Sequence, residues 1–541
     1  MLNKILLFLR DKACEPFREH LLFMITLFVF MATPCILGQI YSDYYYYALL
    51  LSLHCFVLAY LVTLVVSLIR LKSIRLTVKV LLIAASVLYF GLNFYSVHEL
   101  GGLIDEDYLM LIVNTNPHEA NEFATAMLPG WIVLAVAGIF LFFIFLWWLS
   151  SRKNLNLGKK ASIIAVVLLL ICIAQNIRNW IIWEDGPVKH ISELLSATSD
   201  YEVPDASIFN QTRPLIVFNE DRGNDVPANV VLIIGESFAR FHSSLYGYDK
   251  PTNPCLGAMR GNHQLFTFDS INTPASTTSM SLKYMLSEFS KNDKSSKKWY
   301  EYASIIEIMR SCGYECLWMS NQARAGKFNY IARFFAEGSD RYWFLQNEGV
   351  TQNNTIHDAV LVDSTDLFIN EIDDNRRHFV VYHMMGSHFD YSLRYSDDFA
   401  RFKENDYMNH PKSQREILAN YDNSILYNDF IVNQIMNIYS NTESLVLYVP
   451  DHGQDMFTSS PDYFIHGKSN DSISYAAGVK IPFMIYASPK FRQKYPDIID
   501  RVENRQNHPK SWNCDDLPYL ILDLIGVKEL NGVDVKSKSI L

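Results

Sequence analysis

A nearly unbroken apolar run, NVVLII (229–234), leads directly into Gly235, Glu236 and Ser237. A strand with so few polar residues is buried on both faces, which is typical of a parallel sheet covered by helices. Helix-like stretches at 299–311, 358–372 and 414–440 separate further runs of this kind, which are ECLWMS (315–320), HFVVYHMM (378–385), SLVLYVP (444–450) and KIPFMIYA (480–487). This alternation predicts an α/β domain built on a largely parallel sheet.

Polar side chains follow three of these runs where each strand would end. Glu236 follows the first run, His388 follows the third, and Asp451 and His452 follow the fourth. Ligands of parallel sheets gather beyond the carboxyl ends of the strands, so we expect these residues at one rim, joined by His466 from FIHGK. Carboxylates and histidines together form an oxygen and nitrogen ligand set that suits zinc or manganese.

Each of these residues also has a purely structural explanation. A glutamate after a strand often interacts with the dipole of the next helix, and an aspartate such as Asp451 often caps a loop. Single histidines are common in loops. Their joint placement at strand ends is what favours a metal site.

A Ser- and Thr-rich turn precedes another helix-like run in NTPASTTSMSLKYMLS (272–287). A hydroxyl at a helix N-terminus benefits from the helix dipole, and coordination to a dication lowers its pKa enough to give an alkoxide near neutral pH. Thr277 or Thr278 would serve equally well as a helix cap. The residues alone do not decide whether Thr277 or Thr278 is a nucleophile or a helix cap.

The first third of the chain is far more apolar than the rest. A helix needs about 20 residues to cross a hydrocarbon core, and five stretches meet this requirement, at 21–40, 47–68, 77–96, 129–150 and 161–183. Lys and Arg gather before the first stretch and at the second and fourth turnarounds, whereas 41–46 and 97–127 contain neither. Because positive charge stays on the cytoplasmic side, the N-terminus is expected inside and everything beyond residue 183 outside.

We therefore expect a transmembrane domain (1–183), a connector with several prolines (184–228) and an extracytoplasmic catalytic domain (229–541). The net charge of −10 and the absence of a Lys/Arg run that resembles a binding arm argue against a nucleic-acid partner. Four of the eight cysteines lie in the polar part, where they permit up to two disulfides without requiring any. We expect a monomer.

The segment GESFARFHSSLYGYDKPTNP (235–254) resembles the phosphoethanolamine transferases of bacterial envelopes, a group that includes lipid A modifying and colistin-resistance enzymes. The resemblance covers nearly the whole chain and implies a five-helix transmembrane bundle followed by an alkaline-phosphatase- or sulfatase-like α/β domain. It implies a zinc ion held by Glu236, Thr278, Asp451 and His452, with a second metal or Mn²⁺ as further options. The family's nucleophile lies three residues before a serine and seven before a methionine, which selects Thr278 over Thr277.

The same resemblance implies substrate-binding roles for five residues, which are His388, His466, Lys327 in SNQARAGK (320–327), and Thr115 and Glu119 in the loop between the third and fourth spans. The implied donor is phosphatidylethanolamine, a membrane lipid. The implied acceptor is lipid A, lipopolysaccharide or another envelope glycan. The implied location is the bacterial inner membrane, with the catalytic domain in the periplasm.

The implied reaction has two steps. Thr278 attacks the donor phosphorus, diacylglycerol leaves, and the acceptor then attacks the phosphoethanolamine-threonine, with His388 or His466 protonating the leaving group. A lipoteichoic-acid-synthase-like glycerophosphate transferase is the first alternative, which the YGY and TP elements of the 235–254 segment disfavour. A catalytically inactive envelope-assembly protein is the second, and the complete set of candidate ligands disfavours it.

Overall fold

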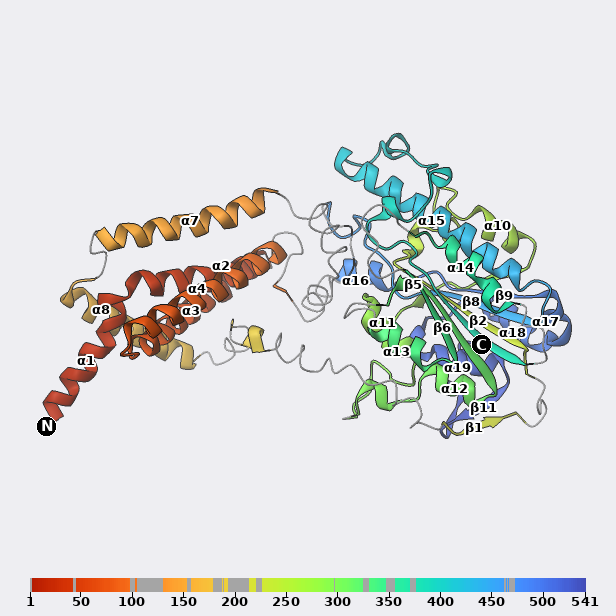
Figure 1. The fold of residues 1–541 in the computed structure, drawn as a ribbon, viewed down its shortest axis with the longest axis horizontal. Helices are drawn as coiled ribbons and strands as arrows, with labels where there is room; N and C mark the ends of the chain where they lie inside the picture. The colour runs from red at the N-terminus through yellow and green to blue at the C-terminus, as the bar shows by residue number, and fades with distance from the viewer. Residues whose placement is uncertain are drawn as a thin grey trace. The chain divides into compact units, whose positions relative to one another are not determined.

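The structure is a computed structural model, and it describes residues 2–41, 45–97, 103–104, 130–152, 157–178, 187, 189–192, 214–219, 226–295, 297–324, 330–346, 356–369, 376–461, 464, 466 and 472–541. The described residues form two units, one within 2–192 and the other within 214–541 (Figure 1). The domain boundaries expected at residues 183 and 228 stay predictions.

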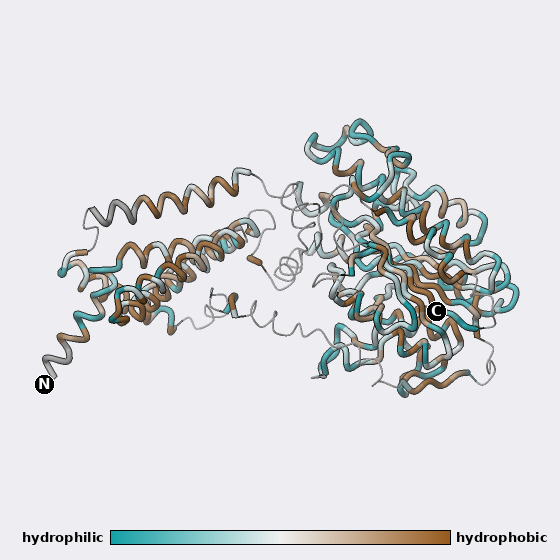
Figure 2. Tube along the Cα trace, viewed as in Figure 1, coloured by the Kyte–Doolittle hydropathy of each residue, from teal (hydrophilic) through white to brown (hydrophobic). Residues whose placement is uncertain are grey.

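The first unit consists of helices, which are α1 (Leu2–Glu19), α2 (Leu21–Tyr41), α3 (Tyr45–Ser67), α4 (Lys72–Tyr95), α7 (Gly130–Arg152) and α8 (Lys159–Arg178). The last five confirm the five predicted apolar helices. Within the described residues α2, α3, α4 and α8 are each long and apolar enough to cross a membrane, and α7 is apolar over Gly130–Phe145 (Figure 2). Helix α1 is an additional element that the sequence analysis did not anticipate.

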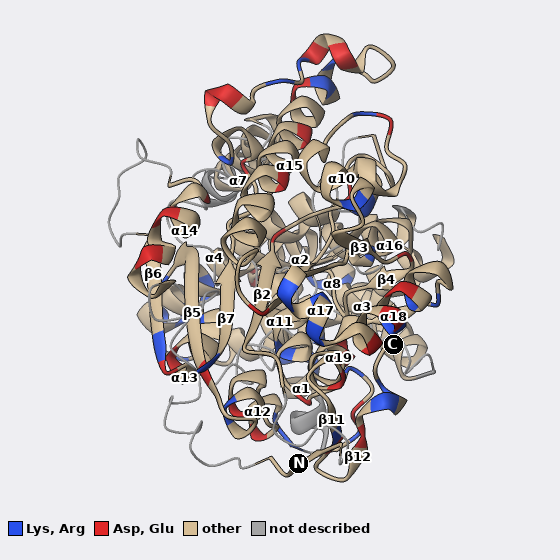
Figure 3. Cartoon of the chain, turned by 90° about the vertical axis from the view of Figure 1, so that its right-hand side faces the viewer, with Lys and Arg blue, Asp and Glu red and all other residues tan. Residues whose placement is uncertain are grey.

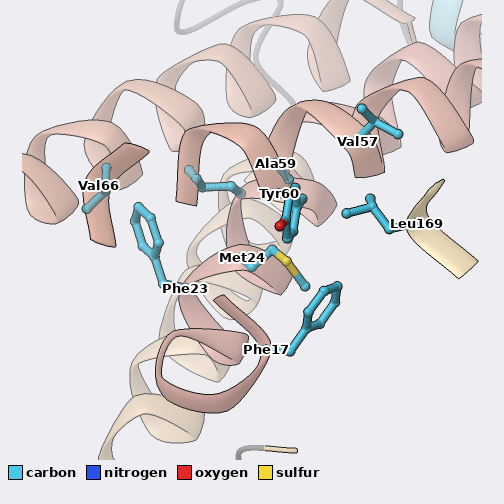
Figure 4. Close-up of a cluster of buried hydrophobic side chains, with 9 residues drawn as sticks. Phe17, Phe23, Met24, Val57, Ala59, Tyr60, Val66 and Leu169 are labelled. Carbon is cyan, nitrogen blue, oxygen red and sulfur yellow. The ribbon is translucent and has the colours of Figure 1, made fainter. Parts of the chain in front are cut away.

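The helices of this unit pack through apolar side chains. Phe17 of α1 stacks on Tyr60 of α3 at a centroid distance of 5.5 Å, within a cluster that includes Met24 and Leu169 (Figure 4). Other apolar side chains point outward, such as Leu134, which is 73% exposed. A bundle with apolar residues both inside and outside is a membrane domain, since water would not tolerate so large an apolar surface.

Several short pieces of the predicted connector (184–228) are among the described residues. His190 packs on the first unit, where its ring nitrogen lies 3.3 Å from the hydroxyl of Tyr89 in α4. Strand β1 (Ile216–Phe218) belongs to the second unit and pairs with β11 (Val527–Leu530), which also pairs with β12 (Val533–Asp534).

The second unit is built on a seven-stranded sheet of order β3-β9-β8-β2-β7-β5-β6. Its strands are β2 (Asn229–Gly235), β3 (Leu265–Thr267), β5 (Tyr314–Ala323), β6 (Arg341–Gln346), β7 (Arg377–His383), β8 (Ser444–Pro450) and β9 (Met484–Ala487). The pairs of β2 with β7 and β8, and of β5 with β6 and β7, are parallel, whereas β9 is antiparallel to β8 and β3. The predicted α/β class is confirmed, and β2 occupies the centre of the sheet with every residue buried.

All five predicted strands exist, but β9 is shorter than the predicted run at 480–487. Pro482 lacks a backbone N–H and cannot join a central ladder, so the regular strand starts at Met484. A separate small pair, β4 (Ile271–Asn272) with β10 (Trp512–Asn513), was not predicted.

Helices cover both faces of the sheet; in Figure 1, α10 (Pro254–Gly261) and α15 (Lys412–Ile438) lie on one side, with α12 (Ile305–Ser311) and α19 (Leu517–Leu524) on the other. The predicted helix at 414–440 is confirmed by α15. The prediction at 299–311 is only partly right, because Ser304 forms a capping box with Glu307 and the α-helix begins after it. The prediction at 358–372 yields only the short α14 (Ala359–Asp363) and a 3₁₀ turn. The remaining helices are α11 (Thr278–Met285), α13 (Tyr330–Gly338), α16 (Ser472–Val479), α17 (Pro489–Lys494) and α18 (Pro496–Asn507).

Candidate active site

The register of β2 and β8 brings Glu236 and Asp451 together. Gly235 pairs with Pro450 in the parallel ladder, so the next residue of each strand emerges at the same carboxyl edge. The backbone N–H of Asp451 donates to the carbonyl of Gly235 at 3.0 Å. Both carboxylates are buried, with exposed fractions of 1% for Glu236 and 0% for Asp451.

The turn after β7 closes tightly over Glu236. Gly386 has φ 53°, and a Cβ on it would lie only 2.8 Å from the backbone nitrogen and oxygen of Glu236. Asp358 holds this turn, since its carboxylate accepts from the N–H groups of Met385 and Gly386, both at 2.8 Å. Ser237 also has positive φ (55°) and donates its hydroxyl to Glu236 Oε1 at 2.7 Å. The positive φ of Ser237, which is unfavourable for a residue other than glycine, and the close turn at Gly386 together fix the position of Glu236.

Glu236, Asp451 and His452 offer ligand atoms that all lie within 4.8 Å of one another. His452 Nε2 is 3.2 Å from Glu236 Oε1 and 3.5 Å from Asp451 Oδ2. The other ring nitrogen, Nδ1, donates to the carbonyl of Gly453 at 2.7 Å, which leaves Nε2 facing the carboxylates.

The two carboxylate oxygens of Asp451 differ in their hydrogen bonding. Its Oδ1 accepts from the backbone N–H of Ser237 at 3.2 Å and of His452 at 2.7 Å. Its Oδ2 is buried and has no hydrogen-bond partner within the described part of the chain. A buried carboxylate oxygen without a partner is costly, and a cation is the natural group to satisfy it.

The pKa values of the three cluster residues are strongly shifted. Burial, helped by the charge of Glu236, raises the pKa of Asp451 to about 8. Burial works to lower the pKa of His452, but Asp451 and Glu236 outweigh it and raise the pKa to about 9. Burial also works to raise the pKa of Glu236, but His452 outweighs it and lowers that pKa well below its usual value. The cluster therefore needs positive charge, which protons supply when no metal ion is bound.

Thr278 is the first residue of α11, and its hydroxyl faces the cluster. The hydroxyl donates to Glu236 Oε2 at 3.3 Å and lies 3.3 Å from His452 Nε2. Thr277 occupies the N-cap position, but its side chain makes no capping hydrogen bond. The helix-cap explanation is therefore wrong for Thr278, and of the two hydroxyls it is that of Thr278 that meets the candidate ligands.

His466 lies against His452, with ring centroids 3.9 Å apart. Its Nδ1 is 2.8 Å from Gln454 Oε1, and the Gln454 amide nitrogen donates to the carbonyl of Phe464 at 3.0 Å. Because the amide nitrogen is used in this way, Oε1 must accept, and the hydrogen of His466 is on Nδ1. With its hydrogen on Nδ1, His466 carries the ring lone pair on Nε2, and burial, with the nearby His452, lowers the pKa of His466 well below its usual value.

His388 lies on the loop after β7, and its charge helps to lower the pKa of Glu236. Sequence analysis missed Gln322 and Gln454. Gln322, near the end of β5, donates its amide to Glu236 Oε2 at 3.3 Å and to the carbonyl of Met384 at 3.1 Å. Its position near the end of a parallel strand was an available signal. Lys327, Thr115 and Glu119 lie outside the described residues.

The 235–254 segment, which carries the family resemblance, acts mainly in the fold. His242 lies 2.6 Å from Asp422 of α15, and the hydroxyl of Tyr248 donates to the same carboxylate at 2.7 Å. Tyr407 donates to it as well. Apart from Glu236, these residues tie the loop after β2 to α15 instead of entering the ligand cluster.

Comparison with known proteins identifies the family of the chain. The sulfatase family model matches residues 228–527, more than half of the chain. The phosphoethanolamine transferase EptC of Escherichia coli K12 is 24% identical over 453 residues, which cover 79% of this chain and 76% of that protein.

Two solved structures are similar. The integral membrane lipooligosaccharide phosphoethanolamine transferase A of Neisseria meningitidis has the same fold, with a TM-score of 0.69 at 19% identity, over 97% of this chain and 98% of its own. The periplasmic domain of Escherichia coli EptC, in complex with Zn, gives a TM-score of 0.53 at 25% identity, over 60% of this chain and 89% of its own. The expected helical membrane region and sulfatase-like domain are confirmed. The chain belongs to the sulfatase family, and its resemblance to the envelope phosphoethanolamine transferases is confirmed.

Proposed function

We propose that this protein transfers phosphoethanolamine from phosphatidylethanolamine to lipid A, lipopolysaccharide or another envelope glycan through a covalent intermediate on Thr278. One observation carries the proposal: Thr278 Oγ1 lies 3.3 Å from both Glu236 Oε2 and His452 Nε2, in a cluster where Asp451 Oδ2 is buried with no partner among the residues that the structure describes. The names of the similar proteins support the same reaction class.

The donor set fits zinc. Glu236, Asp451 and His452, with the hydroxyl of Thr278, would supply the oxygen and nitrogen ligands that zinc prefers, and a relative's periplasmic domain has been crystallised with Zn. Bound zinc would lower the pKa of the hydroxyl and stabilise negative charge on phosphoryl oxygens. Mn²⁺, or a second ion near His388 and His466, is compatible with the same residues.

Each residue of the site then has its own role in the reaction. Thr278 Oγ1 forms a bond to phosphorus as the bond to the diacylglycerol oxygen breaks, and Glu236 Oε2 is placed to receive the hydroxyl proton. His388 supplies a proton to the leaving oxygen, whereas the lowered pKa of His466 suits a neutral ring that binds substrate or a second ion through Nε2. In the second step an acceptor oxygen forms a bond to phosphorus as the bond to Thr278 Oγ1 breaks, and the proton held by Glu236 returns to Oγ1.

The membrane domain suits a lipid donor, whose acyl chains stay in the bilayer while the headgroup is processed. The distribution of Lys and Arg places the N-terminus in the cytoplasm and the catalytic domain in the periplasm. By resemblance, Thr115, Glu119 and Lys327 complete the substrate-binding set. The proposal keeps the division into 1–183, 184–228 and 229–541, and a monomer.

The test is to incubate the full-length protein with phosphatidylethanolamine and zinc, without acceptor, and to digest it with trypsin. The peptide 261–283, which contains Thr278 and ends at the next basic residue, should gain the mass of phosphoethanolamine. Fragmentation should place the group on Thr278, and Thr277→Ala should still carry it. A glycerophosphate adduct would point to the alternative transferase class, and an unmodified peptide would refute the proposal.

A further inference from the structure

A short loop after α11 is unusually basic for this chain. Four lysines, Lys291, Lys294, Lys297 and Lys298, lie within eight residues, and all four are exposed. The only acidic residue among them is Asp293, in a protein with a net charge of −10. On the face of the second unit shown in Figure 3, basic and acidic residues are intermixed, so a segment dominated by one sign of charge is distinctive. We call these four residues the lysine loop.

A lysine-rich segment is often a mobile, solvated chain, but this one is fixed to α11. Tyr284 of α11 stacks on Phe289 at 5.1 Å with an interplanar angle of 12°, and Phe289 contacts the ring of Tyr302 at 5.4 Å. The hydroxyl of Tyr302 donates to Asp293, whose carboxylate also accepts from the backbone N–H of Ser295 at 2.7 Å. The aromatic contacts hold the lysine loop on the same helix that begins with Thr278.

The loop also contacts the segment that leads into the nucleophile. The ammonium group of Lys291 donates to the carbonyl of Pro274 at 3.0 Å and to the hydroxyl of Tyr475 in α16 at 2.7 Å. Pro274 precedes Thr278 by only four residues. The lysine loop therefore contacts both the segment that leads into Thr278 and helix α16.

We propose that the lysine loop binds phosphate groups of the acceptor and so holds the acceptor next to Thr278. This inference rests on the proposed function. Lysine is a compact positive charge that pairs well with phosphate. The donor headgroup carries an ammonium group of its own, which lysines repel, whereas a phosphorylated glycolipid is purely anionic at its headgroup. Charge complementarity therefore favours the acceptor over the donor.

The experiment uses the full-length protein in nonionic detergent and diphosphorylated lipid A as the probe. The variant is Lys294→Glu/Lys297→Glu, which leaves the contacts of Lys291 in place. The matched control is Lys510→Glu/Lys528→Glu, which makes the same charge change at two exposed lysines elsewhere in the second unit. The measured quantity is the Kd for lipid A at two salt concentrations. At about 50 mM salt exposed charges interact strongly, and at about 500 mM salt they interact weakly.

We expect the lysine-loop variant to raise the Kd about tenfold at low salt, with a much smaller change at high salt. The control should stay within about twofold of the wild type. The adduct on peptide 261–283, formed without acceptor, should be unchanged in both variants. An equal Kd for variant and control would overturn the proposal. If the lysine-loop variant loses the adduct in vesicles only when anionic lipid is present, the loop docks on the bilayer instead, and the proposal is also overturned. Absence of the adduct in the wild type would refute the proposed function, separately from the Kd comparison.

Discussion

Replacing Asp451 with Asn should stabilise the metal-free protein and remove its response to zinc. The carboxylate is fully buried, and its Oδ2 has no hydrogen-bond partner among the described residues. The Oδ1 of Asn would keep the two backbone donors, from Ser237 and His452, that Asp451 uses now. Its amide nitrogen would replace the uncompensated oxygen, which lies 3.5 Å from His452 Nε2, with a neutral group.

The size of the effect follows from the pKa of Asp451, which rises from 3.8 to about 8. A carboxylate with a raised folded-state pKa makes the protein less stable as the pH rises from the unfolded-state to the folded-state value. Between pH 3.8 and 7 this amounts to roughly 4 kcal/mol, at about 1.4 kcal/mol per pH unit. Because Glu236 and His452 share the charge, about half of that is a reasonable expectation, which corresponds to a Tm increase of about 4 °C at pH 7. The increase should shrink towards zero near pH 4.

The assay is thermal unfolding of the full-length protein in detergent after chelation, with and without added zinc. Zinc should raise the Tm of the wild type, more at pH 8 than at pH 6 because protons compete for the same ligands, and should not raise the Tm of Asp451→Asn. Asp358→Asn is the matched control, since that buried carboxylate uses both oxygens as acceptors and should lower the Tm. A lower Tm for metal-free Asp451→Asn at pH 8, or a preserved zinc response, would refute the reasoning.

Four further outcomes are expected. Thr278→Asn should lose the phosphoethanolamine adduct, measured by peptide mass, while Thr277→Asn keeps it, because a helix cap tolerates Asn and a nucleophile does not. Gln454→Leu should lower kcat by about tenfold or more without changing bound zinc per chain, because His466 loses the acceptor that orients it. Gly386→Ala should lower the Tm and abolish activity, since the added Cβ meets backbone at 2.8 Å and the positive φ alone costs about 1 kcal/mol or more. A periplasm-active reporter should be active when fused after residue 190 and inactive after residue 155; the reverse result would place the site in the cytoplasm.

The large elements of the fold could be read from the sequence because their hydrophobic patterns are strong. The buried strands β2, β7 and β8 and the long helix α15 coincide with predicted segments. Short elements could not be read, because pairs such as β4 with β10 depend on partners more than 200 residues away. The local hydrophobic pattern of a short segment does not predict such long-range strand pairing.

The candidate site was predictable in part for a geometric reason. Glu236 and Asp451 both follow apolar strands, and parallel strands end at one edge, so their meeting needed only the right strand order. The roles of Gln322 and Gln454 were not predictable, since a glutamine gains meaning only from what its amide touches. The residue types alone left Thr277 and Thr278 open, and the spacing of the resembling family selected Thr278; in the structure it is the Thr278 hydroxyl that contacts Glu236.

The cluster around Glu236 is better explained by ion binding than by stability. A folded domain gains nothing from burying three ionisable groups within 4.8 Å of one another, because the cost of desolvation exceeds what their mutual attraction returns. The surrounding backbone nevertheless holds them there, through positive φ at Ser237 and through a turn that only Gly386 can make. Unfavourable electrostatics held by unfavourable backbone is the signature of a functional site. A dication held by Glu236, Asp451 and His452 would offset the buried negative charge and satisfy Asp451 Oδ2, next to the hydroxyl of Thr278.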